Sequence, residues 1–260
     1  MAEALLWLNG ALLPAGEARI DPADRGLLLG DGLFETMHAQ DGGVPDLPLH
    51  FARLSKGAAL LRLPVPLTLP ELETACRAVL AANGAPEAAL RLTLTRGSGP
   101  RGLLPPSHPS PTVLITAGPL PPGGPLRLIT ASILRDETSP LSGAKTLNYL
   151  PGVLARIEAA EAGADDALLL NRQGFVAETS SANIFVRLGG AWFTPPVEDG
   201  ALPGILRGKL LHAGRVREAR LAPAQLRQAE AIFAGNVLRL RPVIVLDGHP
   251  IAPGDPAELS

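Results

Sequence analysis

An α+β fold of two domains is predicted by three features of this 260-residue sequence. The length suffices for one large or two medium domains, and 46% hydrophobic with 18% charged residues is typical of a compact soluble protein. Residues 117–125, AGPLPPGGP, lack hydrophobic periodicity and resemble a linker. Strand-like and helix-like segments are mixed on both sides of it, which favours an α+β pair over a doubly wound sheet. We place a small N-terminal α/β domain at 1–118, a linker at 119–125 and a larger C-terminal α+β domain at 126–260.

The first domain is predicted to open with a hairpin, because two apolar runs within Leu5–Leu13 flank Asn9-Gly10. Glycine-punctuated sequence then leads into a strand at Leu33–His38. Helical spacing and strict alternation predict the remaining elements, which are helices at Leu49–Leu63 and Pro70–Ala82 and strands at Ala88–Thr95 and Thr112–Ala117. The last two strands are joined by RGSGPRGLLPPSHPSP, and loops of this length are usually functional or disordered.

The second domain is predicted from the same two periodicities. Its helices are expected at Leu150–Ala162, Ile205–Ala213 and Pro223–Arg227. Its strands are expected at Leu126–Ser132, Ala167–Asn171, Phe175–Glu178, Asn183–Arg187, Ala231–Ala234 and Pro242–Leu246.

Composition and charge exclude several kinds of partner. A net charge of -2 with 3% aromatic residues offers neither a basic face nor rings on which bases could stack, so nucleic acid is not expected to bind. No apolar run approaches the roughly 20 residues that span a membrane, and the N-terminus lacks the basic region of a signal peptide, so we expect a cytoplasmic protein. Cys76 is the single cysteine and the five histidines show no metal-ligand spacing, so we expect no metal site.

Lys145 is the candidate nucleophile. It is one of three lysines in the chain and lies in SPLSGAKTLNY, behind Pro140 and a Ser-Gly-Ala turn, shortly before a predicted helix. The alternative is an ordinary exposed loop lysine, since most lysines lie at the surface.

Six motifs occur in a recognisable order: DRGLLLGDGLFET, HFARL, RGSGPRG, SPLSGAKTLNYLPGVLARIEAAEAGADDALLLN, GFVAETSSANIF and LPGILR. Together they resemble the class IV aminotransferases, the fold-type IV pyridoxal-phosphate enzymes, over roughly Trp7 to Val243. This family includes branched-chain and D-amino-acid aminotransferases and 4-amino-4-deoxychorismate lyase. The resemblance implies a D-amino-acid aminotransferase-like fold with pyridoxal 5'-phosphate (PLP) at the domain interface, a small-molecule substrate and a homodimer.

The resemblance also implies which residues hold the cofactor. Lys145 matches the lysine that forms the Schiff base and then moves the substrate's proton. Glu178 matches the carboxylate that faces the pyridine nitrogen and keeps it protonated. Arg53 matches the phosphate-binding cation, which forks onto phosphate oxygens. The remaining implied contacts are the helix start at Gly204 with the backbone amides of Ile205 and Leu206, Asn183, and Asn236 in place of the family's threonine.

Among the family's reactions, the sequence favours the lyase. RGSGPRG resembles the lyase loop, in which Arg101, and also Arg96, would meet a substrate carboxylate, and Leu103 replaces the histidine of the D-amino-acid enzymes. Branched-chain enzymes space their lysine and tyrosine one residue further apart than Lys145 and Tyr149. Thr36 occupies a position where lyases often carry threonine. The resemblance also assigns Phe34 and Tyr149 to the substrate site.

The expected reaction converts 4-amino-4-deoxychorismate to 4-aminobenzoate and pyruvate, a step of folate biosynthesis. Lys145 would remove the ring proton, and Thr36 would assist the leaving group. For Thr36 the alternative is a β-branched core residue. For the whole chain the alternatives are an aminotransferase acting on D-amino acids, branched-chain amino acids or (R)-amines, and a cofactor-less binding protein on the same fold.

Overall fold

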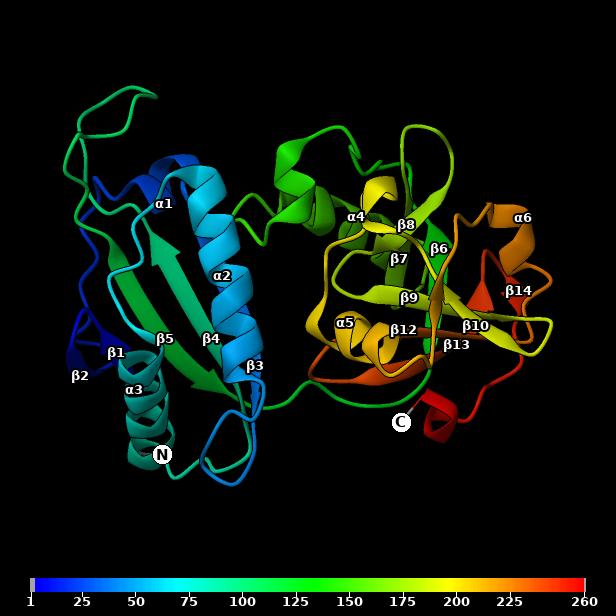
Figure 1. Cartoon of the computed structure of the whole chain (residues 1–260), viewed down its shortest axis with the longest axis horizontal. Coiled ribbons are helices and arrows are strands. Elements are labelled where there is room, and N and C mark those ends of the chain that lie inside the picture. Colours follow the sequence, from blue (N-terminus) through cyan, green and yellow to red (C-terminus); the bar gives the residue numbers. More distant parts are fainter. Residues whose placement is uncertain (1–2, 260) are drawn as a thin grey trace. The chain divides into compact units, whose positions relative to one another are not determined.

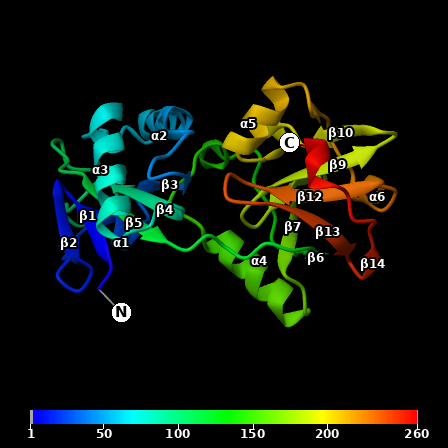
Figure 2. The same ribbon diagram turned by 90° about the horizontal axis from the view of Figure 1, so that it is seen from below.

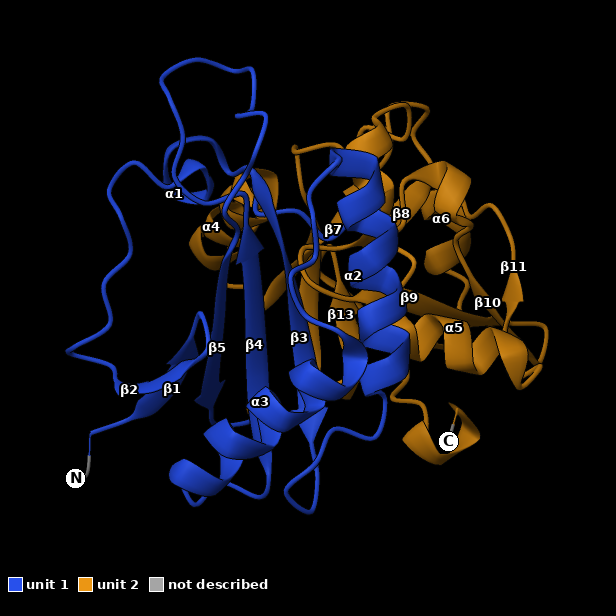
Figure 3. Ribbon diagram, turned by 60° about the vertical axis from the view of Figure 1, so that its left-hand side comes forward, with its two compact units in different colours: residues 1–121, 144–148 blue, residues 122–143, 149–260 orange. Residues whose placement is uncertain are grey.

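The computed structural model describes residues 3–259, which form two compact units (Figure 3). Unit 1 contains the chain up to Pro121 together with Ala144–Asn148, and unit 2 contains Pro122–Gly143 and the chain from Tyr149 onward. The predicted linker at 119–125 lies where the chain first passes from unit 1 to unit 2. Composition gave no sign that Ala144–Asn148 returns to unit 1.

Unit 1 is an antiparallel sheet with its two longer helices on one face (Figures 1 and 3). Its elements are β1 (Leu5–Leu8), β2 (Ala11–Pro14), α1 (Arg25–Leu29), β3 (Gly32–Ala39), α2 (Leu47–Leu61), α3 (Leu69–Ala82), β4 (Ala88–Thr95) and β5 (Thr112–Gly118). The strand order is β2-β1-β5-β4-β3, which leaves β3 at an edge of this path.

The two faces of this sheet follow from the side-chain alternation of its strands. In β4 the even-numbered residues, such as Leu90 and Leu92, are buried in the core beneath α2 and α3, whereas Arg91 is exposed on the opposite face. In β3 the parity is reversed, so that Leu33 and Met37 enter the same core. Phe34 therefore lies on the face that carries Arg91. One face is filled by helices and the other presents polar groups.

Unit 2 is built on a long mixed sheet. Its strands are β6 (Leu126–Thr130), β7 (Asp166–Leu170), β8 (Val176–Thr179), β9 (Asn183–Leu188), β10 (Ala191–Thr194), β11 (Arg217–Glu218), β12 (Ala231–Gly235), β13 (Leu240–Leu246) and β14 (His249–Pro250). They are ordered β11-β10-β9-β12-β13-β6-β7-β8, with β14 pairing β13. The helical elements are η1 (Pro140–Gly143), α4 (Leu150–Glu161), η2 (Val197–Asp199), α5 (Ile205–His212), α6 (Pro223–Leu226) and η3 (Pro256–Leu259).

Helix α4 has two apolar faces, of which one is buried and the other is exposed. Ala155 and Ala159 are fully buried against β7, and α4 lies beside this strand in Figure 2. The small alanine side chains let the helix pack closely on the sheet. The side chains at the stripe positions i, i+3, i+4 and i+7 remain exposed, and these are Leu150, Val153, Leu154 and Ile157.

The α+β, two-domain prediction is confirmed, and most predicted elements occur within a few residues of their expected bounds. Helix α2 starts at Leu47 rather than Leu49, because Pro48 is tolerated in its first turn. The elements missed are the single-turn α1, the short strands β10, β11 and β14, and the 3-10 turns η1, η2 and η3. Along the described part of the chain, no helix combines the length and apolarity needed to traverse a membrane.

Candidate active site

Lys145 lies on an extra strand-like segment at the edge of β3. The amide of Phe34 donates to the carbonyl of Lys145 (2.9 Å), and the amide of Leu147 donates to the carbonyl of Gly32 (3.0 Å). An added Cβ at Gly32 would lie 2.5 Å from the carbonyl oxygen of Leu94 in β4 and 2.8 Å from Leu147 Cδ1, so glycine suits the position where both β4 and the Lys145 segment approach β3. The sheet edge thus fixes the backbone of the candidate nucleophile.

The half-buried Lys145 side chain points to the polar face of the sheet. Its Nζ lies 4.3 Å from the centroid of the Phe34 ring, and the Arg91 guanidinium carbon lies 3.9 Å from the same centroid. Thr36 pairs with Arg91 in the antiparallel register and is half-buried. The predicted residues Lys145, Phe34 and Thr36 are therefore brought together on this face.

Arg91 is a candidate site residue that the sequence analysis missed. Its position was readable, since it is the one charged residue within the strand AALRLTLT. From the alternation of the strand alone, however, Arg91 is predicted to be an ordinary solvent-exposed arginine. Its contact with an aromatic ring beside the lysine becomes apparent only when β3 and β4 are paired.

The predicted phosphate ligand Arg53 belongs to a buried ion cluster. Its Nε and Nη2 contact the two carboxylate oxygens of Glu35 at 2.8 and 2.5 Å, and His50 Nδ1 lies 2.7 Å from Glu35 Oε2. Burial raises the pKa of Glu35, but the hydrogen bonds from Arg53 and His50 outweigh it, so that the pKa lies below its usual value. Glu35 and His50 therefore fix the orientation of Arg53, and its role toward phosphate stays a prediction.

Helix α2 brings this cluster close to the Lys145 segment. Gly57, one helical turn after Arg53, faces Leu33 and Ala144, and an added Cβ there would lie 3.1 Å from Leu33 Cδ2 and 3.7 Å from Ala144 Cβ. Arg53 is thus one turn from the place where α2 packs on the residue preceding Lys145.

Arg96, predicted to bind substrate, is buried and already engaged. Its Nε and Nη2 donate to the Asp31 carboxylate at 2.8 and 2.9 Å, and its guanidinium also donates to the carbonyls of Leu61 (2.8 Å) and Arg62 (3.0 Å). Only 4% of the residue is exposed. Because most of its guanidinium donors are used, the structure favours a scaffolding role for Arg96 over the predicted substrate contact.

Arg101, the other predicted substrate ligand, is exposed on the loop between β4 and β5. The loop is held from beneath by buried Arg25, whose Nη1 donates to the carbonyl of Gly102 (2.9 Å) and whose Nη2 donates to that of Leu103 (2.8 Å). Arg101 therefore sits on an anchored segment with its side chain accessible.

In unit 2, Glu178 lies in β8 and is 8% exposed. Its Oε1 is 3.1 Å from Arg135 Nη2, and its Oε2 accepts from the amide of Leu202 (3.0 Å). Charge and a backbone donor both stabilise the ionised carboxylate, which is the form needed opposite a protonated pyridine nitrogen.

The start of α5 is shaped by Asn183. The Asn183 side-chain amide donates to the carbonyl of Leu202 (2.9 Å), and an added Cβ at Gly204 would lie 2.0 Å from Asn183 Oδ1. Gly204 is the N-cap of α5, so the amides of Ile205 and Leu206 occupy the first turn, where they have no acceptor within the helix. Asn183 thus positions the predicted phosphate-binding turn.

Asn236 and Tyr149 are placed less directly. The Asn236 Oδ1 accepts from the amides of Leu238 (2.9 Å) and Arg239 (3.3 Å), and its Nδ2 donates to the carbonyl of Ser181 (3.3 Å). This amide shapes its own turn, and a contact with phosphate stays a prediction. Tyr149 is the half-buried N-cap of α4 in unit 2.

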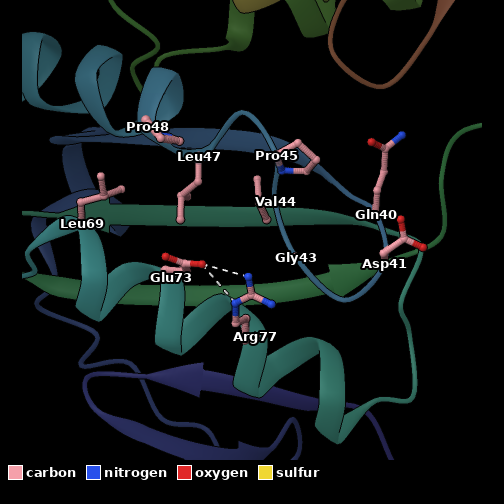
Figure 4. Close-up of a pocket in the computed structure, with 10 residues that line it drawn as sticks. All are labelled: Gln40, Asp41, Gly43, Val44, Pro45, Leu47, Pro48, Leu69, Glu73 and Arg77. Atoms are coloured by element: carbon pink, nitrogen blue, oxygen red, sulfur yellow. Dashed lines mark hydrogen bonds and ion pairs between the residues drawn. The ribbon is translucent and has the colours of Figure 1, made fainter.

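A groove of about 410 Å³ in unit 1 contains none of the predicted site residues (Figure 4). The exposed pair Glu73–Arg77 lies along it, with Arg77 Nη2 3.0 Å from Glu73 Oε1. Its lining is Gln40, Asp41, Gly43, Val44, Pro45, Leu47, Pro48, Leu69, Glu73 and Arg77.

Comparison with known proteins identifies the family. The sequence model described as "Amino-transferase class IV" matches residues 32–245. The chain belongs to the class IV aminotransferases. It is 38% identical over 256 residues, 95% of this chain and 89% of the relative, to the "Putative branched-chain-amino-acid aminotransferase" of Methanocaldococcus jannaschii.

Solved structures of this family are closely similar. A branched-chain amino acid aminotransferase from T.th., in complex with N-(5'-phosphopyridoxyl)-L-glutamate, has a TM-score of 0.89 and 30% identity, covering 98% of this chain and 90% of that one. A Legionella pneumophila protein named "Putative 4-amino-4-deoxychorismate lyase" has a TM-score of 0.88 and 29% identity, covering 94% and 92%.

The protein is therefore a PLP-dependent enzyme with the fold of the class IV aminotransferases. The residues fit the cofactor chemically. Unit 1 offers a lysine amine on a fixed backbone, and unit 2 offers a buried carboxylate and a helix start in which Gly204 leaves no room for a side chain. The individual contacts to the cofactor remain predictions.

Proposed function

We propose that the chain is a PLP-dependent aminotransferase that exchanges amino groups between a branched-chain amino acid and a dicarboxylic 2-oxo acid. The supporting observation is that Lys145 shares one sheet face with both an apolar ring, Phe34, and an exposed cation, Arg91. Transamination needs one site to accept two substrates in turn. An aliphatic side chain suits Phe34, and the second carboxylate of a dicarboxylate suits Arg91.

The relatives favour this interpretation over the lyase that the sequence favoured. The Methanocaldococcus jannaschii relative carries a branched-chain aminotransferase name, although Lys145 and Tyr149 are spaced as we expected of other subgroups. Under this proposal, the spacing of Lys145 and Tyr149 does not separate the subgroups. The T.th. branched-chain enzyme has been solved both with a phosphopyridoxyl-glutamate and with 4-methylvaleric acid, a dicarboxylic and an aliphatic ligand.

In this proposal the chain's residues have separate tasks. The Lys145 amine holds the cofactor and carries the proton that moves at the substrate's α-carbon. The cofactor supplies an electron sink, and Glu178 supports it by staying ionised. Arg53 and the first turn of α5 bind the phosphate, while Arg91 and Arg101 provide cations for substrate carboxylates.

Product analysis with purified protein and added PLP tests the proposal. Leucine with 2-oxoglutarate should yield glutamate and 4-methyl-2-oxopentanoate, and D-leucine and D-alanine serve as stereochemical controls. Arg91→Gln should slow the half-reaction with glutamate more than that with leucine. Absence of glutamate from every branched-chain donor would refute the proposal.

The lyase remains a second candidate because of Thr36. Its side chain lies on the Lys145 face of the sheet, two residues along β3 from Phe34, as the lyase hypothesis requires. Incubation with 4-amino-4-deoxychorismate should distinguish the two. Formation of 4-aminobenzoate and pyruvate that is lost in Thr36→Val, together with no glutamate from leucine, would favour the lyase.

We also propose a homodimer. The outer stripe of α4 exposes 72% of Leu150 and 52% of Leu154, and contiguous exposed apolar side chains usually mark an interaction surface. Leu154→Asp should shift the mass measured by light scattering from dimer to monomer. The matched control is Leu60→Asp on α2, where 45% of the leucine is exposed. A monomeric wild-type protein would contradict the proposal.

A further inference from the structure

Arg135 contacts three segments that the proposed active site uses. It follows β6, and its own amide donates to the carbonyl of Leu170 (2.8 Å), which fixes its backbone beside β7. Its side chain is 23% exposed, and the partners of its guanidinium all belong to unit 2.

The guanidinium of Arg135 has one charged and two neutral partners. Nη2 lies 3.1 Å from Glu178 Oε1 and donates to the carbonyl of Ser142 (3.1 Å), and Nε donates to the carbonyl of Gly200 (3.1 Å). Ser142 precedes Lys145 by three residues in the chain, and Gly200 precedes Leu202 by two. The Arg135 side chain therefore contacts the segment that leads to Lys145, the candidate partner of the pyridine nitrogen, and the segment that leads to the predicted phosphate-binding turn.

The turn at Gly200 packs closely against Arg135. Gly200 has a φ of +95°, and an added Cβ there would lie 3.3 Å from Arg135 Cβ, so the turn can pass this close only as glycine. The same turn continues to Leu202, whose amide donates to the other oxygen of Glu178 (3.0 Å). Glu178 is thus held at Oε1 by Arg135 and at Oε2 by the turn that Arg135 anchors.

We propose that Arg135 is a positioning residue that acts through Glu178, keeping this carboxylate ionised and aimed at the cofactor's ring nitrogen. The proposal rests on the proposed function, in which Glu178 meets that nitrogen. An opposite charge at this distance favours the charged form of a carboxyl, and the forked geometry of arginine fixes its direction. Without Arg135, Glu178 would hold a proton more readily and support a protonated ring nitrogen less.

Two substitutions separate charge from geometry. Arg135→Gln removes the charge, whereas Arg135→Lys keeps a cation but loses the fork that reaches both carbonyls. Arg187→Gln is the matched control, because Arg187 is also a partly buried arginine of unit 2 with carboxylate partners, Glu230 and Glu258. Circular dichroism and thermal unfolding establish that each variant folds.

The decisive readout is the ¹⁵N chemical shift of ring-labelled PLP bound to each variant, which reports protonation of the ring nitrogen and does not depend on turnover. Arg135→Gln should move this shift toward the unprotonated value and lower kcat about tenfold or more, since an adjacent charge shifts a carboxyl pKa by about one unit or more. Arg135→Lys should restore most of the shift, and Arg187→Gln should leave it unchanged. An unchanged shift in Arg135→Gln would overturn the proposal.

A double-mutant cycle tests whether Arg135 acts through Glu178. In a Glu178→Gln background, Arg135→Gln should cause less than about a twofold further loss of kcat, because the carboxylate it acts on is already gone. An undiminished loss would refute the coupling. If Glu178→Gln alone leaves the ¹⁵N shift unchanged, the assignment of Glu178 in the proposed function fails. If Glu178→Gln moves the shift but Arg135→Gln does not, only the proposal for Arg135 fails.

Discussion

Glu35 and Asp31 in unit 1 are fixed in a different way from Glu178 in unit 2. In unit 1, Glu35 and Asp31 are held by side chains alone, each carboxylate between two cationic or ionisable partners in a buried cluster. In unit 2, Glu178 is held by one arginine and one backbone amide of a turn. The clusters of Glu35 and Asp31 fix helices and loops to the sheet, whereas the contacts of Glu178 fix the orientation of one carboxylate.

Because of this difference, we expect substitutions in unit 1 and around Glu178 to affect stability and catalysis differently. Removing one partner from a buried ion cluster leaves an uncompensated charge and costs several kcal/mol of unfolding free energy. Removing one partner of Glu178 should cost less unfolding free energy, because either the backbone amide of Leu202 or the partly exposed Arg135 remains in contact with the carboxylate. Substitutions in the unit 1 clusters should therefore destabilise the fold, whereas substitutions at Lys145 or around Glu178 should mainly alter catalysis.

The largest catalytic effect is expected at Lys145. Lys145→Ala should lower kcat by on the order of 10³-fold or more, because the proton-transfer group is lost, and should abolish the visible absorbance of covalently bound PLP. The melting temperature should stay near that of the wild type, since the segment is held by backbone hydrogen bonds. Lys56→Ala, a surface-lysine substitution on α2, is the control, and a similar loss there would argue against a special role for Lys145.

The largest loss of stability is expected at Glu35. Glu35→Gln leaves Arg53 and buried His50 without their carboxylate and should reduce the unfolding free energy by about 3–5 kcal/mol in urea. Glu73→Gln removes an exposed i,i+4 partner of Arg77 and should cost no more than about 0.5 kcal/mol. Equal losses for the two variants would contradict the distinction between the clusters.

Arg96 and Arg101 provide the same comparison within a short stretch of sequence. Arg96→Ala should destabilise the protein by about 3 kcal/mol because it breaks the buried pair with Asp31. Arg101→Ala should leave unfolding unchanged and raise KM for a dicarboxylate about tenfold, as expected for loss of one charged hydrogen bond. Steady-state kinetics and urea unfolding of both variants check the pair, and a stable Arg96→Ala with raised KM would reverse the assignment.

The smallest expected effect is a pH dependence of stability. The pKa of Glu35 is lowered in the folded protein, because hydrogen bonds from Arg53 and His50 outweigh the effect of burial. Its contribution is therefore fully present above the unfolded pKa of about 4.3 and is lost as the pH falls through the lower folded value. Urea unfolding between pH 6 and 3, taken as rough limits around that value, should show a steeper loss in the wild type than in Glu35→Gln. Parallel curves would show that Glu35 does not contribute.

Local patterns predicted much of the fold. Asn9-Gly10 forms the expected hairpin with positive φ at both residues, and the alternation of Ala88–Thr95 correctly predicted a half-buried strand. Long-range pairing was beyond such patterns. The segment around Lys145 has no strand-like alternation and adopts its conformation only because β3 offers it an edge.

The candidate site divides in the same way. Motif order identified the family and named Lys145 and Glu178, whereas Arg91 and Arg135 were missed because each is defined by contacts with distant segments. For Arg96 the motif suggested a ligand, but the structure buries its guanidinium against Asp31 and two helix-end carbonyls. Sequence spacing cannot tell an arginine facing a substrate from one that supports a loop.

The strand-like segment beside β3 also has a consequence for the order in which the protein is made. Residues up to Pro121 supply the sheet, but the segment that pairs with the start of the β3 edge, at Gly32 and Phe34, is complete only when Ala144–Asn148 has been synthesised. Without this segment, unit 1 would leave the start of that strand edge unpaired, and an unpaired edge is a template for association with other chains. The lysine that we expect to carry the chemistry therefore lies in the segment that pairs with the start of this edge, so a truncated unit 1 should lack the nucleophile and be more prone to aggregate.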